Sequence, residues 1–256
     1  MSSIDVDSLR DKVKAMYQAV ADEPDGTFHF EMGHDLAARL GYPTSDLAQI
    51  PPEAVESFAG VGHHLGMADL TVGDRVVDLG SGSGTDAFLA GNRVGDSGEV
   101  VGIDMTDAQL AKARRLADRD GYTNSRFEHG YIEHVPIDDG WADAVISNGV
   151  INLCSDKTAV FREIVRILAP GGRMAISDIV TEQPLTQAIV CDVNLWASCI
   201  GGAMQEDDYR AAIEAAGLEI VTVVDNPEYR FISDSAQGAT TTFGVKSISV
   251  LARRPE

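Results

Sequence analysis

Residues 76–84 read VVDLGSGSG and place an apolar run, one aspartate and three alternating glycines in a single short stretch. The apolar run, the glycines and the following TDAFLAGNRV at helical spacing predict a strand, a tight turn and a helix. Gly80, Gly82 and Gly84 have no Cβ, so the backbone can turn tightly and a ligand can lie directly against it. We therefore expect a small ligand at this turn.

Strands and helices alternate along the sequence that follows the turn, which predicts an α/β fold with a doubly wound, mostly parallel, seven-stranded sheet. The last two strands are expected to be joined by a loop and not by a helix, which favours a hairpin and one antiparallel edge. The strands are expected at 75–79, 98–105, 125–132, 142–150, 173–180, 218–225 and 246–254.

The first 70 residues have a different pattern. An amphipathic helix is expected from Asp5 to Ala21, followed by short helices joined by turns. We therefore expect a helical N-terminal cap over residues 1–70. Residues 71–256 are expected to form the ligand-binding domain, with a helical insert at about 184–216.

Composition limits the partners and the location. No run of about 18 apolar residues occurs, and the charged N-terminus lacks the apolar stretch of a signal peptide, so a cytoplasmic protein without a transmembrane helix is expected. The net charge of −20 repels nucleic acids and anionic membranes, so neither is an expected partner. Only five of the 20 basic residues are lysine. That balance suits a high-salt cytoplasm and is equally compatible with an ordinary acidic enzyme.

The residues around the turn narrow the choice of ligand. A dinucleotide fingerprint requires G-x-G-x-x-G, but Thr85 occupies its third glycine position, and the Gly-Lys-Ser/Thr of a phosphate-binding loop is missing. Asp78 and Asp86 flank the turn, which disfavours phosphates and suits a ligand with an ammonium and a sulfonium. Asp104 ends the second strand, where a carboxylate can accept two hydrogen bonds from a ribose diol.

The D-x-G-x-G-x-G turn, Asp104, GYIEHVP and APGG, in this order over roughly 70–180, resemble class I S-adenosylmethionine-dependent methyltransferases. The resemblance implies S-adenosylmethionine as cofactor, with Asp104 on the ribose, Ile132 and Glu133 beside the adenine, and Asn148 facing the sulfonium. The cofactor-binding residues that it implies are Asp78, Gly80, Ser81, Gly82, Gly84, Asp86, Asp104, Met105, Ile132, Glu133 and Asn148.

Two later stretches, ISNGVINL and LWASCIGGA, resemble the arsenite methyltransferase family. That family has S-N-C-V-x-N-L at the fourth strand and a cysteine before Gly-Gly-Ala, and its thiolates bind trivalent arsenic. Cys199 fits the second motif, and the resemblance makes Cys199 and Asn148 the candidate catalytic residues. The chain departs from the family at Gly149, which replaces the first cysteine, and no cysteine precedes Cys154.

The acceptor site has fewer signals. Cys154, Cys191 and Cys199 are an odd number without CxxC spacing, so neither a disulfide framework nor a metal site is expected. Cys154, Cys191 and Cys199 could still form a two- or three-thiolate acceptor site, since Cys191 and Cys199 are about 80° apart around a helix and could share a face. The alternative is that the thiols are buried and inert, as free cysteines more often are. Other candidates, each with an alternative role in the core or the cap, are Asn152, Trp196, His63 and His64.

Together these features predict a methyltransferase for a small acceptor, first trivalent arsenic or another soft nucleophile such as a thiol or selenol. Two alternatives remain at this point: a C-, O- or N-methyltransferase of quinone or sterol type, and a cofactor sensor without turnover. The sequence is compatible with a monomer or a homodimer.

Overall fold

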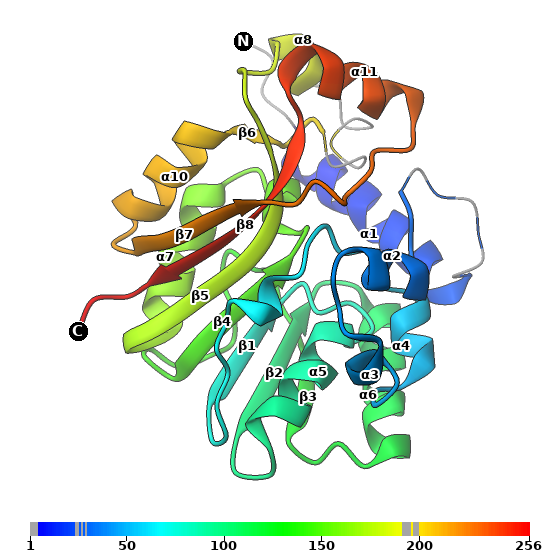
Figure 1. Cartoon of the computed structure of the whole chain (residues 1–256), viewed down its shortest axis with the longest axis vertical. Helices are drawn as coiled ribbons and strands as arrows, with labels where there is room; N and C mark the ends of the chain where they lie inside the picture. Colours follow the sequence, from blue (N-terminus) through cyan, green and yellow to red (C-terminus); the bar gives the residue numbers. More distant parts are fainter. Residues whose placement is uncertain (1–4, 24–25, 27, 29, 191–195, 197–199) are drawn as a thin grey trace.

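The computed structural model describes residues 5–23, 26, 28, 30–190, 196 and 200–256. Its centre is a sheet in the order β3-β2-β1-β4-β5-β8-β7, in which β8 runs antiparallel to both of its neighbours and the other pairs are parallel (Figure 1). The predicted mostly parallel α/β sheet is confirmed. The strands are β1 Arg75–Leu79, β2 Glu99–Asp104, β3 Ser125–His129, β4 Ala142–Asn148, β5 Leu168–Thr181, β7 Glu219–Asp225 and β8 Lys246–Arg253. A short β6, Met204–Gln205, pairs with the end of β5.

Helices cover both faces of this sheet. Successive residues of a strand point to opposite faces, so neighbouring side chains pack against different helices. Val76 packs with the helices α5 and α6, whereas its neighbour Val77 packs with α7 and α10. These four helices are α5 Thr85–Val94, α6 Asp107–Asp120, α7 Lys157–Ile167 and α10 Glu206–Ala215. Burial on both faces explains why the strands are continuous apolar runs.

The N-terminal cap contains α1 Val6–Asp22, α2 His34–Arg39, α3 Thr44–Leu47, α4 Pro52–Glu56 and the 3-10 turn η1 His64–Gly66. Cap side chains such as Leu36 and Phe58 belong to the same buried cluster as Val76 and Phe88 of the sheet domain. The cap and one face of the sheet therefore share a core. The division near residue 70 stays a prediction. None of the described helices is both long and apolar enough to cross a membrane.

The connection between β7 and β8 was wrongly predicted as a loop, because it contains the helix α11 Asp234–Phe243. Gly238 and three threonines give this segment a low intrinsic helix propensity. Its support is tertiary: Ala239 and Phe243 pack in a cluster with Leu9 and Val13 of α1. The local sequence pattern does not indicate this packing.

The helix α7 ends at Ile167, before the Pro-Gly-Gly of residues 170–172, and β5 begins at once with Leu168. The backbone of Gly171 donates to Arg254, and Arg254 donates to Gly172. These bonds hold the glycine segment against the end of the chain in extended form. The predicted insert contains α8 Gln187–Val190 and α10, while Cys191 and Cys199 lie outside the described residues.

Candidate functional site

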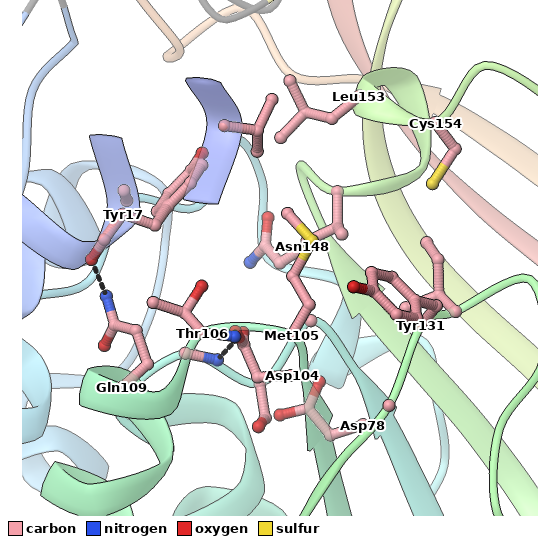
Figure 2. Close-up of a pocket in the computed structure, with 18 of the residues that line it drawn as sticks. Tyr17, Asp78, Asp104, Met105, Thr106, Gln109, Tyr131, Asn148, Leu153 and Cys154 are labelled. Atoms are coloured by element: carbon pink, nitrogen blue, oxygen red, sulfur yellow. Dashed lines mark hydrogen bonds between the residues drawn. The ribbon is translucent and has the colours of Figure 1, made fainter. Parts of the chain in front are cut away.

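A cavity lies at the carboxyl ends of β1, β2 and β4, where ligands bind in open α/β sheets. It contains about 1120 Å³ of unfilled space, including its open mouth. Its walls come from α1, the cap segment 57–60, the glycine turn 80–83, and the residues that follow β2, β3 and β4 (Figure 2). Segments far apart in the sequence therefore meet at one site.

The glycine turn has the backbone that the sequence predicts. Gly80 and Gly82 have φ values of +73° and +52°, in the left-handed region that glycine adopts without strain. A Cβ built on Gly80 would lie 2.4 Å from a methyl carbon of Val150, so a side chain there would displace the segment after β4. The N–H groups of Gly80 and Ser81 both donate to the carbonyl of Ile103, which fixes the turn to the end of β2.

Asp104 holds the turn from the other side. Its Oδ2 accepts a hydrogen bond from the N–H of Gly82 at 2.9 Å, and its Oδ1 accepts from the N–H of Thr106 at 2.8 Å. Burial raises the pKa of Asp104, and these bonds partly oppose that effect. The carboxylate lines the cavity and has further lone pairs for a ligand.

Asp78 supplies an acceptor that lacks a protein partner. It is 2% exposed, and its Oδ2 has no hydrogen bond within the described part of the chain, as is also true of the Ser81 hydroxyl. Burial raises its pKa well above the usual range, and the nearby charges of Asp86 and Asp104 add to the effect. A cationic ligand with N–H donors would satisfy Asp78 and relieve this repulsion. The site therefore fits an ammonium and a sulfonium.

Asp86 and Asn148 join the floor of the cavity to the cap. Tyr42 donates from its hydroxyl to Oδ1 of Asp86 at 2.7 Å. The Asn148 amide accepts from the N–H of Val61 at 2.8 Å and donates to the carbonyl of Gly62, to the Tyr42 oxygen and to Asp86. Both side chains line the cavity, but their polar atoms hold the cap in place.

The opposite end of the cavity is formed by Met105, Ile132 and Glu133. Ile132 is buried, whereas Oε1 of Glu133 forms an ion pair at 3.1 Å with Arg10 of α1. The Arg10 guanidinium also lies 4.8 Å from the ring centre of Tyr131. This end thus offers apolar surface with one carboxylate, which suits a nucleobase.

The model of the methyltransferase domain family matches residues 70–217, more than half of the chain. The chain belongs to this family. It is 37% identical over 218 residues to an arsenite methyltransferase of Halobacterium salinarum, which covers 85% of this chain and 56% of the relative. An arsenite methyltransferase of Homo sapiens is 41% identical over 176 residues, 62% of this chain and 47% of the relative. The chain thus spans about half the length of the curated relatives it matches.

Solved structures support the same membership. A crystal structure of an arsenic(III) S-adenosylmethionine methyltransferase from Chlamydomonas reinhardtii is 31% identical, with a TM-score of 0.68, over 88% of this chain and 75% of that one. A geranyl diphosphate C-methyltransferase from Streptomyces coelicolor has the same TM-score at 19% identity, over 96% and 98%, and shares the fold. The predicted methyltransferase family and its S-adenosylmethionine cofactor are confirmed.

The cofactor residues predicted for this methyltransferase come together. Those that line the cavity are Asp78, Gly80, Ser81, Gly82, Asp86, Asp104, Met105, Ile132, Glu133 and Asn148. Gly84 is not itself in the lining but lies between the lining residues Ser83 and Thr85, at the N-cap of α5, with a φ of +96°. Their individual contacts with the cofactor stay predictions.

The residues predicted for the acceptor are less concentrated. Cys154 lines the cavity (Figure 2). Burial raises the pKa of this thiol, and the charge of Glu133 adds to the effect. Asn152 and Trp196 are buried and lie outside the lining, and Cys191 and Cys199 are not among the described residues.

The two histidines lie in the cap, behind the cavity wall. His64 is fully buried, and its Nε2 is 4.0 Å from Oδ2 of Asp86. Burial lowers its pKa to about 4, which keeps the ring neutral. His63 packs its ring 4.3 Å from that of Tyr42, and burial lowers its pKa as well. Within the described ranges, neither histidine lines the cavity, and no three His, Cys, Asp or Glu side chains group to hold a metal.

The sequence does not predict that α1 and Gln109 form part of the cavity wall. Arg10, Tyr17 and Gln109 all line the cavity of the methyltransferase. The spacing of Thr106 and Gln109 is that of a capping box, which assigns Gln109 to the start of α6. Thr106 makes no side-chain capping bond, and Gln109 bonds to other elements instead. The amphipathic pattern of α1 predicts a buried face but not what that face covers.

Proposed function

We propose that the protein transfers a methyl group from S-adenosylmethionine to trivalent arsenic or another small, soft nucleophile. The observation that carries the proposal is the Cys154 thiol in the wall of the cavity that holds Asp78 and Asp104. The similarity to arsenite methyltransferases, over 85% of the chain for the Halobacterium relative, supports the arsenic acceptor. Thiolate sulfur is the ligand type that soft acceptors prefer.

When bound, S-adenosylmethionine supplies an electrophilic methyl group on a sulfonium. We assign the methionine end to Asp78, Ser81 and the glycines of the turn, because the unpaired buried acceptors lie there. Asp104 would accept from the ribose hydroxyls. Ile132, Met105 and Glu133 would enclose the adenine.

Methyl transfer needs alignment and exclusion of water more than acid or base chemistry. Asn148 serves that need by fixing Val61 and Gly62 of the cap against the end of β4. Cys154 would hold the acceptor from the segment after β4, together with Cys199 as the resemblance to arsenite methyltransferases implies. The neutral, enclosed His64 is assigned to the cap, behind the wall.

A second candidate acceptor is an organic molecule methylated at carbon, oxygen or nitrogen. Apolar side chains also line the cavity that contains Cys154, and they include Leu9, Val13, Val150 and Leu153. Gly149 also removes one thiol that the resemblance to arsenite methyltransferases implies. An apolar pocket of this kind binds carbon-rich ligands well.

The test is methyl transfer from labelled S-adenosylmethionine in the presence of arsenite and excess thiol, with arsenic species separated by chromatography. Methylated arsenic that disappears in Cys154→Ser and Cys199→Ser supports the first candidate. Turnover only on organic acceptors, unchanged by the three single cysteine-to-serine variants, supports the second. Cofactor binding without turnover on either panel contradicts both and favours a sensor.

A further inference from the structure

Gln109 connects two walls of the cavity through one side chain. It lies in the first turn of α6 and is 2% exposed. Its Oε1 accepts a hydrogen bond from the Ser83 hydroxyl of the glycine turn at 2.5 Å. Its Nε2 donates to the carbonyl of Tyr17 on α1 at 3.0 Å, the bond dashed at the left of Figure 2. The same amide therefore contacts the turn and the N-terminal helix.

The helix α1 is the wall that this amide holds. Five of its side chains line the cavity, so the cavity is enclosed only while α1 is docked; they are Val6, Leu9, Arg10, Val13 and Tyr17. Two further polar contacts join α1 to the cavity lining within the described residues. Ser57 donates to the Val20 carbonyl at 3.5 Å, the long limit for a hydrogen bond, and the ion pair between Arg10 and Glu133 is 39% and 17% exposed. Partly exposed ion pairs contribute little to stability. The buried Gln109 bonds are the stronger constraint.

We propose that Gln109 is a positioning residue that couples the docking of α1 to the conformation of the glycine turn, and so to the bound cofactor. This inference rests on the proposed function. The Ser83 hydroxyl donates to the Gln109 amide, and the same amide donates to α1, so Gln109 links the two. When a bound ligand fixes the conformation of the turn, the Ser83 hydroxyl is held next to Oε1 of Gln109. The hydrogen bond between them orients the amide, so that its Nε2 points towards the Tyr17 carbonyl. Because coupling of this kind is reciprocal, docked α1 also stabilises the turn.

The coupling is measurable without ligand, because α1 contains the trypsin sites Arg10, Lys12 and Lys14. Cleavage there requires α1 to leave its place, and its rate follows the open population when reclosing is fast. We expect Ser83→Ala and Gln109→Met each to speed this cleavage about 3- to 10-fold, the effect of losing a hydrogen bond. Cleavage of the double variant should be no faster than cleavage of the faster single variant, because both substitutions break the same connection between the turn and α1.

Two further variants control for effects on folding and on the helix. Gln109→Glu keeps the acceptor for Ser83 but loses the donor to Tyr17, so it should match Gln109→Met. Gln18→Met changes an exposed glutamine of α1 that donates to Asp22, and cleavage in this variant should match the wild type. Urea unfolding of each variant separates opening of α1 from global unfolding.

The inference is overturned if Ser83→Ala leaves the cleavage of α1 unchanged, or if the effects of Ser83→Ala and Gln109→Met multiply. Addition of S-adenosylhomocysteine, with its Kd measured by calorimetry, then tests the link to the cofactor. It should slow α1 cleavage in the wild type and protect Ser83→Ala several-fold less; equal protection overturns the link. A wild type that binds no S-adenosylhomocysteine contradicts the proposed function, whereas the ligand-free rates still decide the contact between turn and helix.

Discussion

Asn148, the last residue of β4, accepts a hydrogen bond from the backbone N–H of Val61, 87 residues earlier in the chain. The same side chain donates to the carbonyl of Gly62 at 3.0 Å. The amide thus replaces the backbone pairing that the cap segment 60–62 lacks at this point. Asn148 is predicted to face the sulfonium, but its polar atoms form hydrogen bonds at the junction between cap and sheet.

We expect Asn148→Ala to lower the free energy of unfolding by about 1–3 kcal/mol, because it leaves buried backbone groups unpaired. Asn148→Asp should destabilise at least as much at neutral pH, since it sets a carboxylate beside Asp86 and the Gly62 carbonyl. The Asp variant should recover part of this loss at acidic pH, where the carboxyl becomes a donor. Urea unfolding at two pH values measures both effects. An Asp variant as stable as wild type at neutral pH would contradict the assignment.

Asp104→Asn should weaken binding of S-adenosylmethionine about 10- to 100-fold, because hydrogen bonds to a carboxylate are stronger than those to an amide. The variant also places an NH₂ group where the N–H of Gly82 or Thr106 now donates. The matched control is Asp107→Asn, at a side chain that is 80% exposed, three residues further along. Calorimetric titration compares the two. Equal affinities would show that Asp104 does not contact the cofactor.

His64 makes stability depend on pH in a defined direction. Burial lowers its pKa from 6.5 to about 4, so the unfolded chain binds this proton more tightly than the folded chain. The contribution of the neutral ring is therefore intact above pH 6.5 and is lost as the pH falls towards 4, by about 1.4 kcal/mol per pH unit. Asp178 has the opposite effect on the pH dependence of stability, because burial raises its pKa to about 6 and the folded chain therefore binds this proton more tightly than the unfolded chain.

Comparison with His64→Leu isolates the histidine from Asp178. The difference in unfolding free energy between the variant and the wild type should grow in favour of the variant between pH 6.5 and 4. His34→Leu, at an exposed position of α2, is the matched control. A pH-independent difference between wild type and His64→Leu would refute the assignment of a buried neutral ring.

The Cys154 thiol should react slowly with disulfide reagents in the folded protein. Burial raises its pKa, so little thiolate exists near neutral pH. In the double variant Cys191→Ser/Cys199→Ser, we expect the folded rate at about pH 8 to be at least ~10-fold below the rate of the same protein in urea. Similar rates in both states would show that the thiol is exposed. Arsenite that protects the remaining thiol in the folded state would place the acceptor at Cys154.

Salt should stabilise the protein, because a net charge of −20 opposes the compact state. Raising KCl from 0.1 M to about 1 M shortens the Debye length from about 10 Å to about 3 Å, which screens this repulsion. We expect the urea midpoint to rise with KCl. The rise should be smaller in Glu214→Gln/Glu219→Gln, which neutralises two exposed carboxylates. A urea midpoint that does not change with KCl would show that repulsion between the acidic groups does not affect stability.

The features that the sequence predicts correctly are local ones. Apolar runs that end in glycine or aspartate identify β1 and β2, and their parallel order brings the turn and Asp104 to the same edge of the sheet. The turn itself is predictable because only glycine adopts its backbone without strain. Most of the residues that the resemblance implies for the cofactor lie at these two places.

The features that the sequence does not predict depend on partners distant in the chain. The Gln109 amide bonds to Tyr17, 92 residues away, while its spacing from Thr106 indicates a helix cap. The helix α11 contains weak helix formers and depends on packing against α1. The two histidines are candidates for the acceptor site because they precede the sheet domain, yet neither of them lines the cavity, and His64 is buried in the cap. In each case tertiary contacts override the local preference.

Gly149 has an evolutionary consequence for the acceptor site. Its φ is +71°, and a Cβ at this position would approach a methyl carbon of Val61 to 3.1 Å. A cysteine, as the arsenite methyltransferase pattern has here, would meet both an unfavourable backbone and a crowded neighbour. A cysteine introduced here by one mutation would therefore destabilise the junction between the cap and β4. We expect relatives that carry a cysteine at this position to have a smaller side chain at the position of Val61, so that the two positions vary together.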